Sequence, residues 1–250
     1  MPFRRAANPI THKLARLSFV LGLFGALAIA AAGPLNKYGL APLEIVLQVL
    51  RYGSYVALAG VALGLPLAWA ARPGQGRRGF VAAMLAVIVG LAGAATPMQW
   101  LRASQTMPPI NDVSTDVADP PAFVELADRR RGARSGPEYP GSGYAALQRA
   151  AYPDIAPLKL KASREDAFSR AEAAARAMGW EIVASSPEQG RIEASARTRW
   201  FGFVDDVAIR IRAEGEDARI DVRSKSRVGV GDLGVNAQRI RAYLARVAPG

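Results

Sequence analysis

Residues Phe80–Leu101 read FVAAMLAVIVGLAGAATPMQWL, a run without a single charged side chain. A helix needs about 20 apolar residues to cross the hydrocarbon core of a bilayer, and this run supplies them. Two comparable runs precede it, Leu14–Ala32 and Leu43–Ala71, and the second is uncharged from Tyr52 onward. The pattern predicts a membrane region over residues 1–101, with transmembrane helices near 14–32, 50–71 and 80–101.

Basic residues flank these runs unevenly. Those of the N-terminal arm and of the 72–79 loop are Arg4, Arg5, Lys13, Arg16, Arg72, Arg77 and Arg78. The intervening stretch 33–51 holds only Lys37 and Arg51. Because cytoplasmic loops carry the excess of Lys and Arg, the N-terminus is predicted to lie in the cytoplasm. The interpretation is a bacterial inner-membrane protein whose domain after Leu101 is periplasmic.

Two features of the helices leave alternatives open. The small residues Ala28–Ala32 resemble a signal-peptide cleavage site, although the preceding apolar core is long for a signal peptide. Gly60 and Gly64 form a G-x-x-x-G pattern, and Ala86 and Gly90 form a similar small-residue pair. Such ridges favour close packing among the three helices over dimerisation. The first and third runs hold no mid-span ionisable residue, which argues against a transporter.

The amino-acid composition excludes several kinds of binding site and catalytic group. The chain carries 32 Lys and Arg against 21 Asp and Glu, and residues 1–101 hold nine of the bases but one acid. The basic excess therefore indicates membrane topology rather than nucleic-acid binding, for which a base-stacking aromatic ladder is missing. The sequence has no Cys and one His, His12, so disulfides, thiolate metal sites and Cys nucleophiles are excluded. We predict no metal site and no cofactor.

The region after Leu101 has two parts. Residues 102–162 are rich in proline and scattered apolar anchors, which predicts an extended segment that wraps a folded core, with a short helix near 145–151. Residues 163–250 show regular patterns, beginning with a helix over about 163–178 that Ser163 and Asp166 cap. Alternation predicts strands over 180–185, 191–199, 206–212 and 218–224, followed by a helix near 235–247. The expected fold is an α+β domain with a four-stranded antiparallel sheet and two helices on one face.

The other face of this sheet is charged. Its predicted residues are Arg197, Arg199, Arg210, Arg212 and Arg223, together with Glu193 and Asp221. One interpretation is a solvated face with cross-strand ion pairs, or a face covered by the proline-rich segment. The other is a platform for an anionic partner.

A glycine-rich stretch follows the last strand. Residues 229–234 match G-x-G-x-x-G, but the chain ends before the second strand and acid that a dinucleotide site requires. Unpaired N–H groups at a helix start attract anions, so a tentative anion site is predicted. Its residues are Arg223, Lys225, Arg227, Gly229, Gly231 and Gly234. The alternative is that Asp232 caps the helix itself.

Acidic residues are the other candidates. The predicted acidic network comprises Asp112, Asp116, Asp205, Asp206, Asp232 and Asn236. Paired carboxylates perform acid–base chemistry or bind hard cations. A carboxylate–arginine network that holds the proline-rich segment to the sheet is the competing interpretation.

Several motifs resemble one family. They are Pro109–Asp116, Pro120–Phe123, Tyr152–Ile155, Trp200–Asp206, Asp221–Gly229, Asp232–Asn236 and Arg239–Arg241. Together they resemble the domain-of-unknown-function family numbered 1499, found in bacterial envelopes and plastids, over about residues 105–247. The resemblance implies no established activity and supplies no catalytic residues.

Three functional hypotheses remain. The first is a binding or envelope-organising module for an anionic ligand such as a lipid head group or a polymer. The second is a periplasmic hydrolase that depends on a metal or on carboxylates, and the absence of an activating base argues against it. The third is a structural partner of another membrane protein, for which the G-x-x-x-G ridge would matter most.

Overall fold

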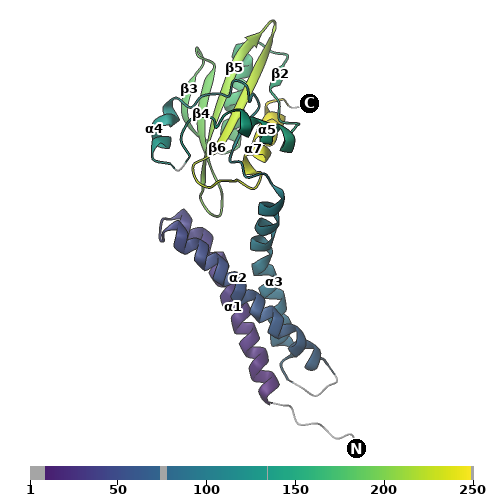
Figure 1. Ribbon diagram of the computed structural model, residues 1–250. Helices are drawn as coiled ribbons and strands as arrows, with labels where there is room; N and C mark the ends of the chain where they lie inside the picture. The colour runs from purple at the N-terminus through teal and green to yellow at the C-terminus, as the bar shows by residue number, and fades with distance from the viewer. Residues whose placement is uncertain (1–8, 74–77, 134, 249–250) are drawn as a thin grey trace, which may run out of the picture. The chain divides into compact units, whose positions relative to one another are not determined.

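The computed structural model describes residues 9–73, 78–133 and 135–248. The chain forms two compact units, one of residues 1–102 with 200–202 and one of residues 103–199 with 203–250. The first contains helices α1 (Pro9–Lys37) and α2 (Leu43–Ala70) and most of α3 (Phe80–Thr106), as Figure 1 shows. All three are long and apolar enough to cross a membrane. Of the bases used to predict orientation, Arg4, Arg5 and Arg77 lie outside the described residues.

Small residues let the three helices approach closely. A Cβ atom added to Gly60 of α2 would lie 2.5 Å from the backbone nitrogen of Gly22 in α1. One added to Gly64 would lie 3.0 Å from the carbonyl oxygen of Ala83 in α3. The G-x-x-x-G ridge therefore serves packing inside this unit.

The sheet of the second unit has six antiparallel strands rather than four. The four predicted strands are present as β3 (Glu181–Ser186), β4 (Arg191–Arg197), β5 (Val204–Glu214) and β6 (Asp217–Ser226). The additional strands, β1 (Asp112–Ser114) and β2 (Leu158–Leu160), both pair with β6, and the order is β1-β6-β5-β4-β3. Each spans three residues, which is too short for alternation to reveal it.

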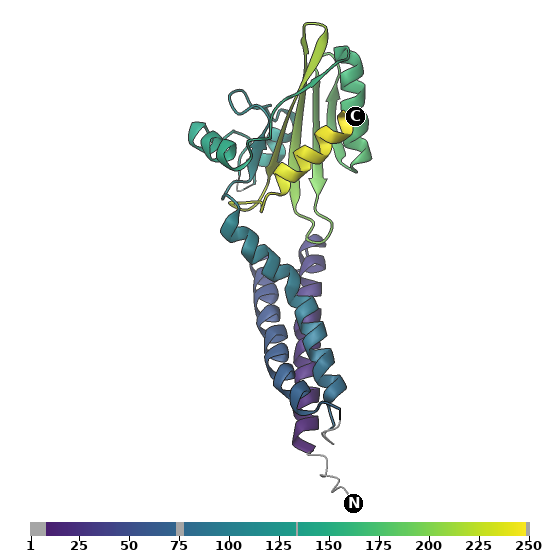
Figure 2. The same cartoon turned by 90° about the vertical axis from the view of Figure 1, so that its right-hand side faces the viewer.

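Two helices cover one face of the sheet, as predicted. Figure 2 shows α6 (Arg164–Ala177, green) and α7 (Val235–Val247, yellow) on the same side of the strands. The Ser163 hydroxyl accepts a hydrogen bond from the Asp166 amide, so α6 begins at its predicted cap. The core lies between these helices and the sheet. The helices contribute Ala171, Ile240 and Tyr243, and the sheet contributes Ile192, Val207, Ile209, Ile220 and Val222.

The proline-rich segment is less extended than expected. It contains α4 (Glu125–Arg131) and α5 (Ser142–Ala151) besides β1 and β2. The short helix expected at 145–151 begins earlier, at Ser142. Helix α4 was not predicted, because its N-terminal turn is held by a side chain distant in the sequence. Glu193 of β4 accepts hydrogen bonds from the amides of Val124, Glu125 and Leu126.

Candidate functional site

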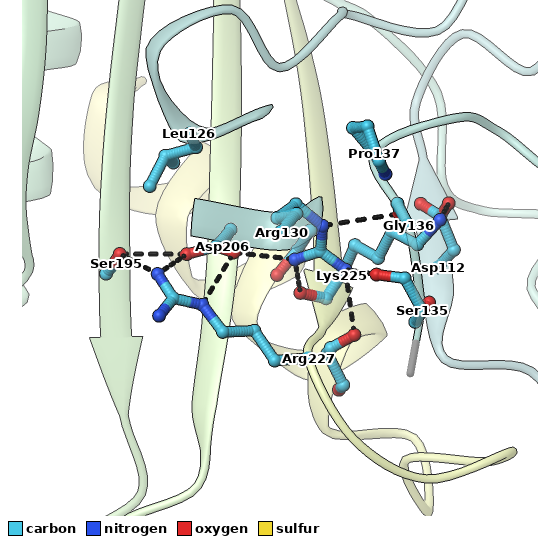
Figure 3. Close-up of polar contacts among 12 residues, drawn as sticks. Asp112, Leu126, Arg130, Ser135, Gly136, Pro137, Ser195, Asp206, Lys225 and Arg227 are labelled. Carbon is cyan, nitrogen blue, oxygen red and sulfur yellow. Dashed lines mark hydrogen bonds and ion pairs between the residues drawn. The ribbon is translucent and has the colours of Figure 1, made fainter. Parts of the chain in front are cut away.

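The charged face of the sheet is buried in its centre. Residues 111–133 and 135–139 lie against it, so a face that reads as polar in the sequence becomes an interior of ion pairs. The basic cluster defined here consists of Arg130, Arg223, Lys225 and Arg227 with the carboxylates of Asp112 and Asp206. Figure 3 shows Arg130, Asp206, Lys225 and Arg227 converging from helix α4, strands β5 and β6, and the turn after β6.

Arg130 lies at the centre of the cluster and is completely buried. One terminal nitrogen, Nη1, lies 2.6 Å from Asp206 and 3.1 Å from the carbonyl of Lys225. The other, Nη2, donates to the carbonyls of Ser135 and Ser226 at 3.1 and 2.9 Å. Burial lowers the pKa of Arg130, and the charge of Asp206 opposes that shift. Sequence reasoning missed this residue, because nothing separates it from its basic neighbours in the run 129–131.

Asp112 organises the second half of the cluster. It accepts two hydrogen bonds from Arg223, at 2.9 and 2.7 Å, in the bidentate geometry that favours arginine. Lys225 reaches the same carboxylate at 3.1 Å. The ring of Phe123 lies 5.0 Å from the Arg130 guanidinium and 4.7 Å from that of Arg223. Its π-face therefore stabilises two cations that have little contact with water.

Asp206 binds three groups at once. Besides Arg130, it accepts two hydrogen bonds from Arg227, at 2.9 and 2.8 Å, and one from the Ser195 hydroxyl at 2.8 Å. The four bases of the cluster thus pair with two carboxylates, and Glu181 adds a third negative charge near Arg227. The cluster carries more positive than negative charge, although buried charges are normally matched.

Backbone carbonyls supply the remaining acceptors. Besides those of Pro121, Lys225 and Ser226, four belong to the segment Ser135–Tyr139, called the strap below. The carbonyls of Ser135 and Gly136 lie 3.1 and 3.4 Å from Arg130 nitrogens. That of Pro137 lies 3.0 Å from Arg223, and that of Glu138 lies 2.6 Å from Lys225. Four successive carbonyl oxygens therefore face three cations.

The predicted acidic residues are divided among three places. Asp112 and Asp206 lie in the basic cluster. Asp116 pairs with Arg219 at 2.7 Å, in a partly buried network with the acids Asp119 and Asp221 and the bases Arg210 and Arg212. In this network, the three arginines Arg210, Arg212 and Arg219 each form ion pairs with both Asp116 and Asp221. Arg210 and Arg212 also form ion pairs with Asp119.

Asp205 points to the opposite face of the sheet, beneath α7. It pairs with Arg239 at 2.6 Å. Beside that pair, the buried amide of Asn236 joins Ser224, Ser226 and the Asn111 carbonyl. These bonds tie the start of α7 to strand β6 and the segment before β1, which is a structural role for Asn236.

The glycine-rich stretch does not join the basic cluster. Ser224 contacts Asn236 of α7, so its neighbours Arg223 and Lys225 point to the other face of the sheet. Asp232 accepts hydrogen bonds from the amides of Gly234 and Asn236, at 2.9 and 2.7 Å, and thus caps α7. Burial raises the pKa of Asp232, and these two amide hydrogen bonds oppose that shift. The residues of the tentative anion site are therefore not assembled into one site.

A family match covers this region. The model of a family described as a protein of unknown function, DUF1499, matches residues 112–247. The chain belongs to the DUF1499 family. The match begins with β1 and ends with α7, so it contains the basic cluster and the strap. No curated protein and no solved structure matches the chain.

The DUF1499 domain also has an open groove on its helical side. The cavity measures about 330 Å³ and is lined by residues 178–180, 196–197, 235, 238–239 and 242. Arg197 is exposed there and forms no ion pair with any residue that the structure describes. Beside it lie the Gln238 amide and Arg239, whose charge Asp205 neutralises. Sequence analysis placed Arg197 on the charged sheet face without identifying this groove.

Metal binding has no visible basis within the described ranges. No group of three or more His, Asp or Glu side chains there is arranged to hold an ion. The carboxylates of the DUF1499 domain that were candidates for chemistry are instead engaged with arginines, lysine or backbone amides.

Proposed function

We propose that this protein is a membrane-anchored binding module whose DUF1499 domain holds an anionic group without transforming it. The observation that carries the proposal is the groove with Arg197, a guanidinium that has no carboxylate partner among the described residues. Ligand sites are typically concave and apolar with a few placed polar groups. Here Ala196 and Ala242 provide apolar surface, and Gln238 adds a neutral donor and acceptor.

The state of the acidic residues supports binding rather than hydrolysis. Asp112, Asp205 and Asp206 each accept hydrogen bonds from arginine, and Asp232 caps a helix. A general base must be free to accept a proton from the attacking group. Each of these four carboxylates is already hydrogen-bonded to an arginine or to backbone amides, which supports binding over hydrolysis.

We further propose that the domain lies outside the cytoplasm, in the periplasm of a bacterium with an inner and an outer membrane. The support is the flanking charge: Lys13, Arg16, Arg72 and Arg78 on one side of the helices, against Lys37 and Arg51 on the other. The ligand is then a component of the envelope with an anionic group, either a lipid head group or an acidic polymer.

Cysteine labelling tests the orientation, because the natural chain has no Cys. Glu188→Cys places a thiol in the exposed turn between β3 and β4, and Arg78→Cys places one before α3. In intact cells, a membrane-impermeant maleimide should label Glu188→Cys alone. Labelling of Arg78→Cys alone would reverse the proposed topology.

Binding is tested on the full chain in nanodiscs. We compare discs that contain phosphatidylglycerol or only phosphatidylcholine, and we add alginate as a soluble acidic polymer. Arg197→Ala should weaken binding of the anionic probe about tenfold, the effect of losing one charge-assisted hydrogen bond. The matched control is Arg149→Ala, an exposed base on α5. Equal affinity of Arg197→Ala and wild type would contradict the proposal, as would an equal loss in both variants.

A further inference from the structure

The strap contacts the basic cluster through its backbone. Its carbonyl oxygens at residues 135–138 accept hydrogen bonds from Arg130, Arg223 and Lys225, which also contact the carboxylates of Asp112 and Asp206. Each cation is therefore held between a carboxylate, which belongs to the sheet, and a carbonyl, which belongs to the strap. The carbonyl oxygens occupy the positions that the oxygens of an anion would take.

The charge of the cluster favours such an anion. Arg130, Arg223, Lys225 and Arg227 share the carboxylates of Asp112 and Asp206. Carbonyl dipoles satisfy hydrogen-bond donors but cancel none of the remaining charge. Burial lowers the pKa of Lys225, and the nearby charge of Arg223 lowers it further against the opposing charge of Asp112.

We propose that the basic cluster is a binding site for a phosphate group and that the strap Ser135–Tyr139 closes it. When the strap moves away, donors of Arg130, Arg223 and Lys225 are freed while Asp112 and Asp206 keep the cations in position. Two guanidinium groups and one ammonium match a phosphate, because arginine forms paired bonds to its oxygens and lysine adds a point charge.

The strap is attached in a way that permits opening. Figure 3 shows Ser135, Gly136 and Pro137 beside Arg130 and Lys225, and their contacts with the cluster come from main-chain atoms. The Tyr139 ring is its main side-chain contact: the ring lies 5.5 Å from the Arg223 guanidinium and packs edge-to-face, at 6.0 Å, on Tyr144 of α5. The Tyr139 hydroxyl is buried with no hydrogen-bond partner among the described residues, and burial raises its pKa to about 12. Strap closure therefore leaves one polar group unsatisfied, which lowers the free energy needed to open it.

This site is distinct from the groove at Arg197. The groove is lined by residues 178–180 and 196–197 and by four residues of α7, and none of the six residues of the basic cluster is among them. A negative result for phosphate binding at the cluster would therefore leave the proposed anion binding at Arg197 unaffected.

The experiment uses the full chain in detergent with inorganic phosphate as the probe and chloride at equal ionic strength as the reference. Binding is measured as the rise in unfolding temperature with phosphate concentration. Lys225→Met removes one cation and should weaken phosphate binding about tenfold. Tyr139→Ala removes the ring that holds the strap to Arg223 and should tighten binding about fivefold, because the open state becomes more populated. Arg149→Ala, an exposed base on α5, is the matched control and should bind phosphate as wild type does.

Three outcomes would overturn the proposal. They are no phosphate-specific stabilisation of wild type, an equal response in Lys225→Met, and a response in Tyr139→Ala that is no stronger than in wild type. If Lys225→Met fails to fold, the phosphate response of Tyr139→Ala tests the proposal, because residues 138 and 140 on either side of Tyr139 are exposed. Nanodiscs with phosphatidic acid against phosphatidylcholine then distinguish a lipid phosphate from free phosphate: only a lipid source makes stabilisation depend on the disc.

Discussion

The two faces of the DUF1499 sheet are built from the same strands but are stabilised in different ways. On the helical face, Val207, Ile209 and Ile211 of β5 pack against α6 and α7 in an apolar core. On the other face, Asp206 of the same strand lies in a buried group of charges. Apolar packing is non-directional and tolerates small changes, whereas a buried ion pair depends on each partner. Alternation in a strand therefore identifies two faces but does not show which of them is in contact with water.

The largest expected effect comes from removing a carboxylate on the charged face. Asp206→Ala leaves Arg130 buried without its ionic partner and deprives Arg227 of its own. We expect the free energy of unfolding to fall by about 4 kcal/mol, the typical cost of an uncompensated buried charge. Chemical denaturation of the detergent-solubilised chain measures it, with exposed Glu188→Gln as the control. A loss below that of an ordinary surface substitution would show that the cluster adds nothing to stability.

A smaller loss is expected on the helical face. Ile209→Val removes one buried methyl group between the sheet and the helices. The free energy of unfolding should fall by about 1 kcal/mol, from lost transfer energy and a small cavity. The same denaturation experiment measures it. A loss as large as that of Asp206→Ala would contradict the contrast between the two faces.

The smallest expected effect is a rise in the stability of the folded chain with pH, caused by Lys225 of the basic cluster. Burial lowers the pKa of Lys225 from its ordinary value of 10.5, so the folded chain releases this proton at a lower pH than the unfolded chain. Between the two pKa values the unfolded state binds more protons, and stability therefore rises with pH. Lys225→Met should remove this rise just below pH 10.5 without a large loss at neutral pH. Parallel stability–pH curves for the two proteins would contradict it.

Most of the fold follows from local patterns. Charge-free runs predict the three long helices, and alternation predicts β3–β6. Helices α6 and α7 follow from their apolar stripes, and Ser163 marks the start of α6. These signals are readable because each element buries one face at its own period. The two short strands and α4 show no such signal, since pairing with β6 and the distant Glu193 create them.

The candidate site was predictable only in part. Arg223, Lys225, Asp112 and Asp206 are recognisable from the sequence as charged residues of interest, but their partners are not. Arg130 lies 76 positions before Asp206, which it binds, and the strap carbonyls belong to a stretch without a pattern. Backbone acceptors leave no mark in a sequence, because every residue type provides one.

The sequence alone is enough to predict a membrane region followed by an α+β domain whose sheet has two different faces. The reason is that the length and the period of apolar residues are local properties, which every stable arrangement of the chain must satisfy. The tertiary structure alone decided that the charged face is covered, that four bases meet two acids there, and that Asp232 caps α7 rather than joining them. Those outcomes depend on how residues 111–133 and 135–139 lie against the strands, and electrostatic pairing between residues far apart in the chain is set by that path.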